Sequence, residues 1–215
     1  MLAQIVLFDG FDLMDAVAPY EVLSAGGSAA GGALTVETVS AEGPRLVPSG
    51  SPGVGLTASS TLDPHRADLV VFPGASGKVG GEGPDTIAAV LARVLETELQ
   101  AGLKAALEEP GLTVATVCGG SLLPALSGFI PGRNAVTHRM AMDVLASTGA
   151  TAVAARVVDD GDLVTAGGVT SGLDLGLYLL ERELGPRIAR AVEELFEYER
   201  RGTVWRPEGP VPVAP

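Results

Sequence analysis

Cys118 is the only cysteine in the 215-residue chain, and it lies between an apolar run and a run of small residues. Residues 112–117 read LTVATV, and residues 119–121 read GGS. This pattern predicts a strand that turns sharply into a helix with the thiol at the bend, because glycines accept tight turns and a helix N-terminus favours a thiolate. A cysteine in such an elbow can act as a nucleophile. The alternative is a buried cysteine that packs as a small apolar side chain.

A thiol that attacks an electrophilic carbon needs a group that moves protons and donors that stabilise the developing charge. Asp15 is the candidate acid, and the backbone N–H groups of Gly74, Ala75 and Gly119 are the candidate donors to an oxyanion or a bound substrate. Simpler roles remain open, since Asp15 can cap the helix after the first strand and Gly74 can be a turn residue.

The two histidines are placed differently. His138 follows a short predicted strand, 20 residues after the cysteine, and can either assist the thiol or form a structural hydrogen bond. His65 lies in the sequence Asp-Pro-His-Arg, which is typical of an exposed loop. His138 is therefore the candidate substrate-binding histidine.

The elements that must position these residues alternate along the chain. The predicted strands cover residues 3–8, 34–40, 68–72, 112–117, 135–137, 153–159 and 163–166, and the predicted helices cover 15–25, 86–107, 121–126, 140–148, 171–184 and 186–198. This alternation predicts an α/β fold with a mostly parallel sheet and helices on both faces. Ligands of such sheets bind beyond the carboxyl ends of the strands, where all the candidate residues lie.

Composition limits the class of protein and of partner. Hydrophobic residues make up 47% of the chain and charged residues 19%, which predicts a folded body. The net charge of -12, with only 14 Lys and Arg residues, argues against nucleic acid as a partner. No stretch reaches the roughly 18 apolar residues of a membrane span. A single cysteine cannot form an internal disulfide, so we expect a cytoplasmic protein. We expect one domain over residues 1–199 and a Pro/Gly-rich tail over residues 200–215.

Five motifs, in order, resemble those of the ThiJ/PfpI superfamily of class I glutamine amidotransferase-like proteins. They are DAVAPYEV at 15–22, FPGA at 72–75, VCGGS at 117–121, AVTH at 135–138 and TAGGVTSGLD at 165–174. Within the superfamily, the chain most resembles the isonitrile (isocyanide) hydratases and the amidotransferase-like sensor domains of AraC-type regulators. The resemblance spans residues from about 2 to 199, and it implies a flavodoxin-like α/β sandwich that forms a homodimer.

By position, the resemblance implies that Cys118 is the nucleophile and Asp15 its acidic partner. The implied substrate is a small electrophile: the thiolate attacks the terminal carbon of an isocyanide to form a thioimidate, and water releases an N-formamide. Asp15 would give a proton to carbon or activate the water. This route uses neither a metal nor an organic cofactor.

Gly119 departs from the motif, because the hydratases usually carry threonine there and the protease-like members carry histidine. Three functional classes therefore stay open, with a hydratase or related enzyme first. A non-enzymatic sensor that binds a metabolite or registers oxidation of Cys118 is second. A glyoxalase-like activity is third, because those branches generally use glutamate where Asp15 stands and a histidine near the cysteine, for which His138 is the candidate.

Overall fold

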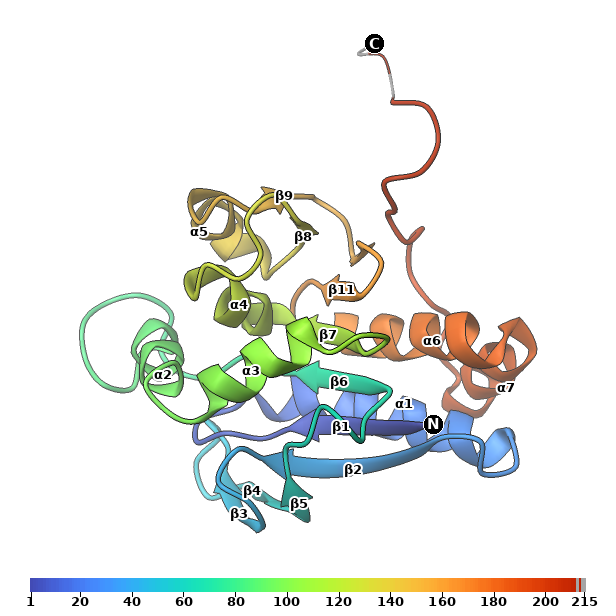
Figure 1. The fold of residues 1–215 in the computed structure, drawn as a ribbon, viewed down its shortest axis with the longest axis horizontal. Coiled ribbons are helices and arrows are strands. Elements are labelled where there is room, and N and C mark those ends of the chain that lie inside the picture. The colour runs from blue at the N-terminus through green and yellow to red at the C-terminus, as the bar shows by residue number, and fades with distance from the viewer. Residues whose placement is uncertain (212, 214–215) are drawn as a thin grey trace.

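A seven-stranded sheet forms the middle layer of the molecule (Figure 1). The computed structural model describes residues 1–211 and 213. In spatial order the strands are β10 (Val157–Asp159), β11 (Leu163–Ala166), β7 (Thr113–Val117), β6 (Leu69–Phe72), β1 (Leu2–Val6), β2 (Thr35–Ser40) and β5 (Ser60–Thr61). Neighbouring strands are parallel except in the β10–β11 hairpin. The predicted mostly parallel sheet is confirmed.

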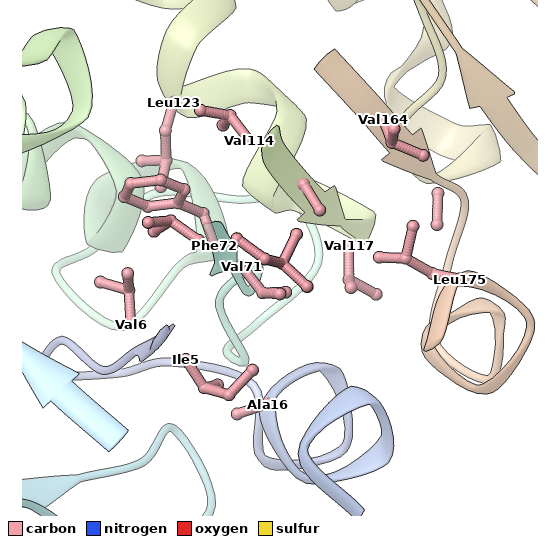
Figure 2. Packing of buried hydrophobic residues seen from close by; sticks show 14 of the residues in the cluster. Ile5, Val6, Ala16, Val71, Phe72, Val114, Val117, Leu123, Val164 and Leu175 are labelled. Atoms are coloured by element: carbon pink, nitrogen blue, oxygen red, sulfur yellow. The ribbon is translucent and has the colours of Figure 1, made fainter. Parts of the chain in front are cut away.

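The central strands are buried because helices cover both faces of the sheet. All four residues of β6 are buried, as are the last four of β7, and both strands are rich in valine. Figure 2 shows this interior, in which Phe72 lies near Leu123 of α4 (Leu122–Leu126) and Ile5 lies near Ala16 of α1 (Leu13–Ala29). The core therefore holds the carboxyl ends of β6 and β7 in fixed positions.

One helical layer consists of α1, α6 (Ser171–Leu184) and α7 (Pro186–Phe196), which contact one another along their lengths. Glycines permit the close approach of α1 and α6. A Cβ atom on Gly26 would lie 2.2 Å from Leu180 Cδ2, and one on Gly176 would lie 2.8 Å from Val22 Cγ1. The other face carries α2 (Ile87–Val94), α3 (Leu99–Glu108) and α4 (Figure 1).

The single helix predicted over residues 86–107 is wrong, because the chain forms α2 and α3 with a break between them. Thr97 makes the break: its hydroxyl donates to the Val94 carbonyl (2.7 Å) and accepts from the Leu99 N–H (3.2 Å). The side chain thus ends one helix and begins the next, as threonine does when it competes with backbone hydrogen bonds.

Short elements complete the fold. A hairpin of β3 (Arg45–Pro48) and β4 (Gly55–Ala58) was not expected from the sequence, nor was the pairing of β8 (Asn134–Ala135) with β9 (Thr151–Ala152). The helices predicted at 121–126 and 140–148 are shorter, because each begins with a 3-10 turn: η1 (Cys118–Ser121) precedes α4, and η2 (Arg139–Ala141) precedes α5 (Met142–Ser147).

The beginning of the predicted tail packs on the body. Trp205 forms a parallel bridge with Val158 of β10, with hydrogen bonds to Asp159 N (2.9 Å) and Val157 O (3.0 Å). Residues 212, 214 and 215 of the predicted tail lie outside the described residues. Among the residues that are described, no helix is long and apolar enough to cross a membrane.

Candidate active site

Cys118 adopts a backbone conformation that few residues other than glycine adopt. Its φ is +56°, and Glu197 is the only other non-glycine residue with positive φ in the described chain. The Cys118 N–H donates to the Gly167 carbonyl (3.0 Å), and the Cys118 carbonyl accepts from the Thr137 hydroxyl (2.7 Å). Such a conformation costs about 1–3 kcal/mol and persists only when its surroundings hold it. The predicted elbow is therefore present.

Gly120 explains why the chain turns so tightly after β7. A Cβ atom on Gly120 would lie 2.3 Å from the Phe72 carbonyl oxygen, so the η1 turn packs directly on the end of β6. The Thr116 and Ser121 hydroxyls bond to each other across the turn (2.6 Å) in full burial. The elbow is thus fixed against the neighbouring strand.

Asp12, and not Asp15, caps α1. The Asp12 carboxylate accepts the N–H groups of Met14 (3.0 Å) and Asp15 (3.1 Å), and it also bonds to the Ser76 hydroxyl. Asp15 is therefore free for another role. Its side chain is 0% exposed; Oδ2 accepts the Gly74 N–H (3.0 Å), whereas Oδ1 has no hydrogen-bond partner among the described residues.

Gly74 brings the acid and the elbow together. A Cβ atom on Gly74 would lie 2.7 Å from the Gly119 nitrogen and 2.8 Å from Asp15 Oδ2, so any side chain there would separate them. The Gly74 N–H is not a free donor, contrary to the expectation from the sequence, because it is used to hold Asp15. Among the described residues, the Ala75 N–H has no partner, and the Gly119 N–H lies where it lowers the pKa of the Cys118 thiol.

The electrostatics of the site favour a protonated Asp15 at neutral pH. Burial, and after it the nearby Asp12 charge, raises the pKa of Asp15 to about 8, although the Gly74 N–H and the Cys118 thiol act in the opposite direction. Asp15 therefore has a proton to donate at pH 7, where an exposed aspartate has none.

The Cys118 thiol does not have the lowered pKa that the sequence predicted. Burial and the charge of ionised Asp15 raise its pKa to about 12, and the Gly119 N–H opposes this only in part. The helical turn behind the thiol is a four-residue 3-10 turn, so little helix dipole acts on it. The repulsion between Asp15 and the thiolate requires an ionised Asp15. Protonation of Asp15 removes this repulsion, and the thiolate then forms more readily.

His138 lies beside the elbow and is linked to it by Thr137. Its Nδ1 accepts the Met140 N–H (3.3 Å), which leaves Nε2 as the available ring nitrogen. The ring packs on Gly168, where a Cβ atom would lie 2.0 Å from His138 Cδ2. No hydrogen bond joins His138 to the thiol in the described chain, so the structure brings Asp15, Gly74, Ala75 and Gly119 to Cys118 more closely than His138. His65 pairs with Glu109 at an exposed position.

Sequence reasoning missed Thr137 and Gly167, which hold the Cys118 backbone. Both residues lie within motifs, AVTH and TAGGVTSGLD, and this was the only available signal, since the contacts join segments far apart in the chain. Within the described residues, no group of three or more His, Cys, Asp or Glu side chains could hold a metal ion.

Comparison with known proteins gives one consistent result. The DJ-1/PfpI family matches residues 1–182. An isonitrile hydratase of Pseudomonas putida is 31% identical over 195 residues, which cover 90% of this chain and 76% of that protein. Protein DJ-1 homolog A of Arabidopsis thaliana is 28% identical over 187 residues, 87% of this chain and 44% of that protein. The crystal structure of Drosophila melanogaster DJ-1beta has a TM-score of 0.75 at 20% identity, covering 92% of this chain and 98% of that chain, which confirms the predicted fold.

Proposed function

The chain belongs to the DJ-1/PfpI family, as its motifs indicated, and we propose that it is a cysteine-dependent enzyme that hydrates an isocyanide to an N-formamide. One observation carries this proposal. A fully buried carboxyl with a pKa near 8 and one unpartnered oxygen is packed beside the only thiol of the chain, in a strained elbow. Family members include proteins that are not enzymes, so the choice of activity depends on this pair.

The relative from Pseudomonas putida supports the substrate class. It is named an isonitrile hydratase, and its 31% identity extends over 90% of this chain. An isocyanide carbon accepts a nucleophile and a proton at the same atom, which suits a thiol beside a protonated acid. The proposed roles follow from that match.

In the first step, the Cys118 sulfur bonds to the terminal isocyanide carbon while Asp15 gives its proton to the same carbon. The product is a thioimidate, with one new C–S bond and one new C–H bond. Ionised Asp15 then recovers the proton that the thiol lost. The Ala75 and Gly119 N–H groups are the donors that can stabilise charge near the carbon, while the Gly74 N–H keeps Asp15 in place.

In the second step, water adds to the C=N bond of the thioimidate. Protonated Asp15 gives its proton to the nitrogen and takes one from that water, so it ends the addition protonated. The C–S bond then breaks, the hydroxyl proton goes to the sulfur, which leaves as the thiol, and the N-formamide is released. The sum is one isocyanide and one water converted to one formamide, without a metal or an organic cofactor.

The assembly and cell compartment are part of the same proposal. We expect a homodimer, which light scattering would detect as twice the 21.7 kDa chain. The lone cysteine fits a reducing compartment. The body over residues 1–199 is the proposed catalytic domain, and residues 200–215 are the proposed tail.

The test is turnover of phenyl isocyanide, followed by formamide production, in wild type, Cys118→Ala and Asp15→Asn. We expect turnover in wild type, none in Cys118→Ala and at least a hundredfold loss in Asp15→Asn. Ser147→Ala, at an exposed site on α5, serves as the control variant. Folded wild-type protein that leaves the isocyanide unchanged would contradict the proposal.

A further inference from the structure

A second hollow lies beside the elbow, at the carboxyl end of β11. It has a volume of about 400 Å³, and three loops line it: the one that contains His138 and Arg139, the one before β10 that contains Arg156, and the one that joins β11 to α6. Figure 1 shows α5, β8 and β9 gathered above β11 in this part of the molecule. Neither Cys118 nor Asp15 lines it, so the proposed chemistry does not account for it.

The charge of this hollow is opposite to that of the chain as a whole. The chain has 26 acidic and 14 basic residues, yet the residues that line the hollow include two arginines and a histidine and no carboxylate. Asp174, behind the lining and 0% exposed, pairs with Arg156 Nε. Two cationic side chains therefore face one hollow on an acidic protein.

The two arginines differ in how they are held. Arg156 is fixed, because its Nε donates to Asp174 Oδ2 (2.5 Å) and its Nη2 donates to the Thr170 hydroxyl (2.8 Å), and the Tyr198 hydroxyl lies beside the same guanidinium. Arg139 is exposed and makes no ion pair in the described chain. A guanidinium fixed by a buried carboxylate and a second one beside it are suited to binding a planar carboxylate.

The remaining lining includes apolar side chains beside the hydroxyls of Thr137 and Ser171. Val136, Met142, Ala154 and Ala155 form the walls. From these observations we propose that the hollow binds a small carboxylate with an apolar body, its carboxylate between Arg139 and Arg156 and its body against Met142 and the alanines.

This site shares two residues with the hydrogen bonds that hold the nucleophile. Thr137 and Gly167 line the hollow, and the same two residues hold the Cys118 carbonyl and N–H. The carboxylate therefore has two possible sources, a carboxylated isocyanide that reaches the thiol and a separate molecule that acts on the elbow. The proposal that the hollow binds a carboxylate does not rest on the proposed function. Only the first source, a carboxylated isocyanide substrate, rests on it.

The test is isothermal titration of the full chain with benzoate, using neutral benzamide as the matched probe. We expect binding of benzoate only, weakened at least fivefold by Arg139→Ala and reduced at high salt. Arg187→Ala removes an equally exposed arginine outside the hollow and should leave binding unchanged. Equal binding of the two probes, or benzoate binding that Arg139→Ala leaves intact, would overturn the proposal.

A kinetic experiment separates the two sources. If the carboxylate belongs to the substrate, Arg139→Ala raises KM for 4-isocyanobenzoate at least fivefold but not for phenyl isocyanide, and benzoate inhibits competitively. If it belongs to a separate molecule, benzoate changes kcat and the two isocyanides respond alike. A protein that binds benzoate but hydrates no isocyanide would refute the proposed function and leave the binding site standing.

Discussion

At the scale of single residues, Asp15 has the most unusual environment. It is fully buried, and its carboxylate accepts the Gly74 N–H beside the Cys118 thiol. Its pKa rises from 3.8 to about 8 on folding, so the folded state binds more protons than the unfolded state between these values. Stability conferred by the protonated form is therefore lost as pH rises from about 4 to 8, and the penalty is constant above 8.

Asp15→Asn should remove this pH dependence, because the amide does not titrate. Relative to wild type, the variant should gain about 3 kcal/mol of unfolding free energy between pH 5 and pH 8. Urea denaturation of both proteins at the two pH values measures this gain. A difference that stays constant from pH 5 to pH 8 would show that Asp15 is ionised in the folded protein.

The residue types of the site were predictable, but their states were not. The sequence placed Cys118 at an elbow and selected Asp15, Gly74, Ala75 and Gly119. It predicted a lowered thiol pKa and a free Gly74 N–H, and both are wrong, because burial and the position of the Asp15 carboxyl are set by packing between segments 59 residues apart.

At the scale of elements, the turn after β6 and the turn after β7 must touch. Gly74 and Gly119 lie at this contact, but they differ in the room available for a side chain. A Cβ atom on Gly74 would lie 2.7 Å from the Gly119 nitrogen, whereas one on Gly119 would meet nothing closer than 3.7 Å. Of these two glycines, only Gly74 is required by the contact.

Gly74→Ala should destabilise the protein by about 1–3 kcal/mol, since the new methyl group must push the backbone of η1 or the Asp15 carboxyl away. Gly119→Ala is the matched control and should change stability by less than about 0.5 kcal/mol. Urea denaturation of both variants provides the measurement. Equal losses in the two variants would mean that the turns do not meet as described.

Element types were more predictable than element ends. The apolar runs gave the buried strands of the central sheet, because such runs are typical of parallel strands. The break at Thr97 was missed, since its apolar spacing continues through α2 and α3 and only the hydroxyl contacts reveal the end. The β3–β4 hairpin was missed because each of its strands has only one buried residue, so no alternation of apolar and polar residues marks it in the sequence.

At the scale of the whole molecule, the C-terminal segment completes the edge of the sheet. Trp205 bridges to β10, and Arg206 donates to the Tyr178 hydroxyl (2.6 Å), with its guanidinium 5.3 Å from the ring centre. The Tyr178 hydroxyl in turn bonds to Asp159. Part of the segment expected to be a simple tail is thus anchored.

Removal of residues 202–215 should lower stability by about 2 kcal/mol, because it deletes these hydrogen bonds and the contact of Arg206 with the ring. Removal of residues 210–215 alone is the control and should have no measurable effect, since Val211 and Val213 are exposed. Thermal denaturation compares the two truncated proteins. Equal melting temperatures would show that the anchored part contributes nothing.

The most direct test of the account is the pH dependence of Cys118 alkylation, because the proposed mechanism requires the Asp15 carboxyl to lie beside this sulfur and exchange protons with it. Iodoacetamide reports the thiolate of a single site, since the chain has one cysteine. Initial rates are measured from pH 6 to pH 10 in wild type, Asp15→Asn and the exposed-site control Asp143→Asn. We predict that Asp15→Asn reacts at least fivefold faster than wild type at pH 10, where ionised Asp15 opposes the thiolate, and at a similar rate at pH 6, while the control follows wild type. Superimposed profiles for wild type and Asp15→Asn would show that the carboxyl does not act on the sulfur.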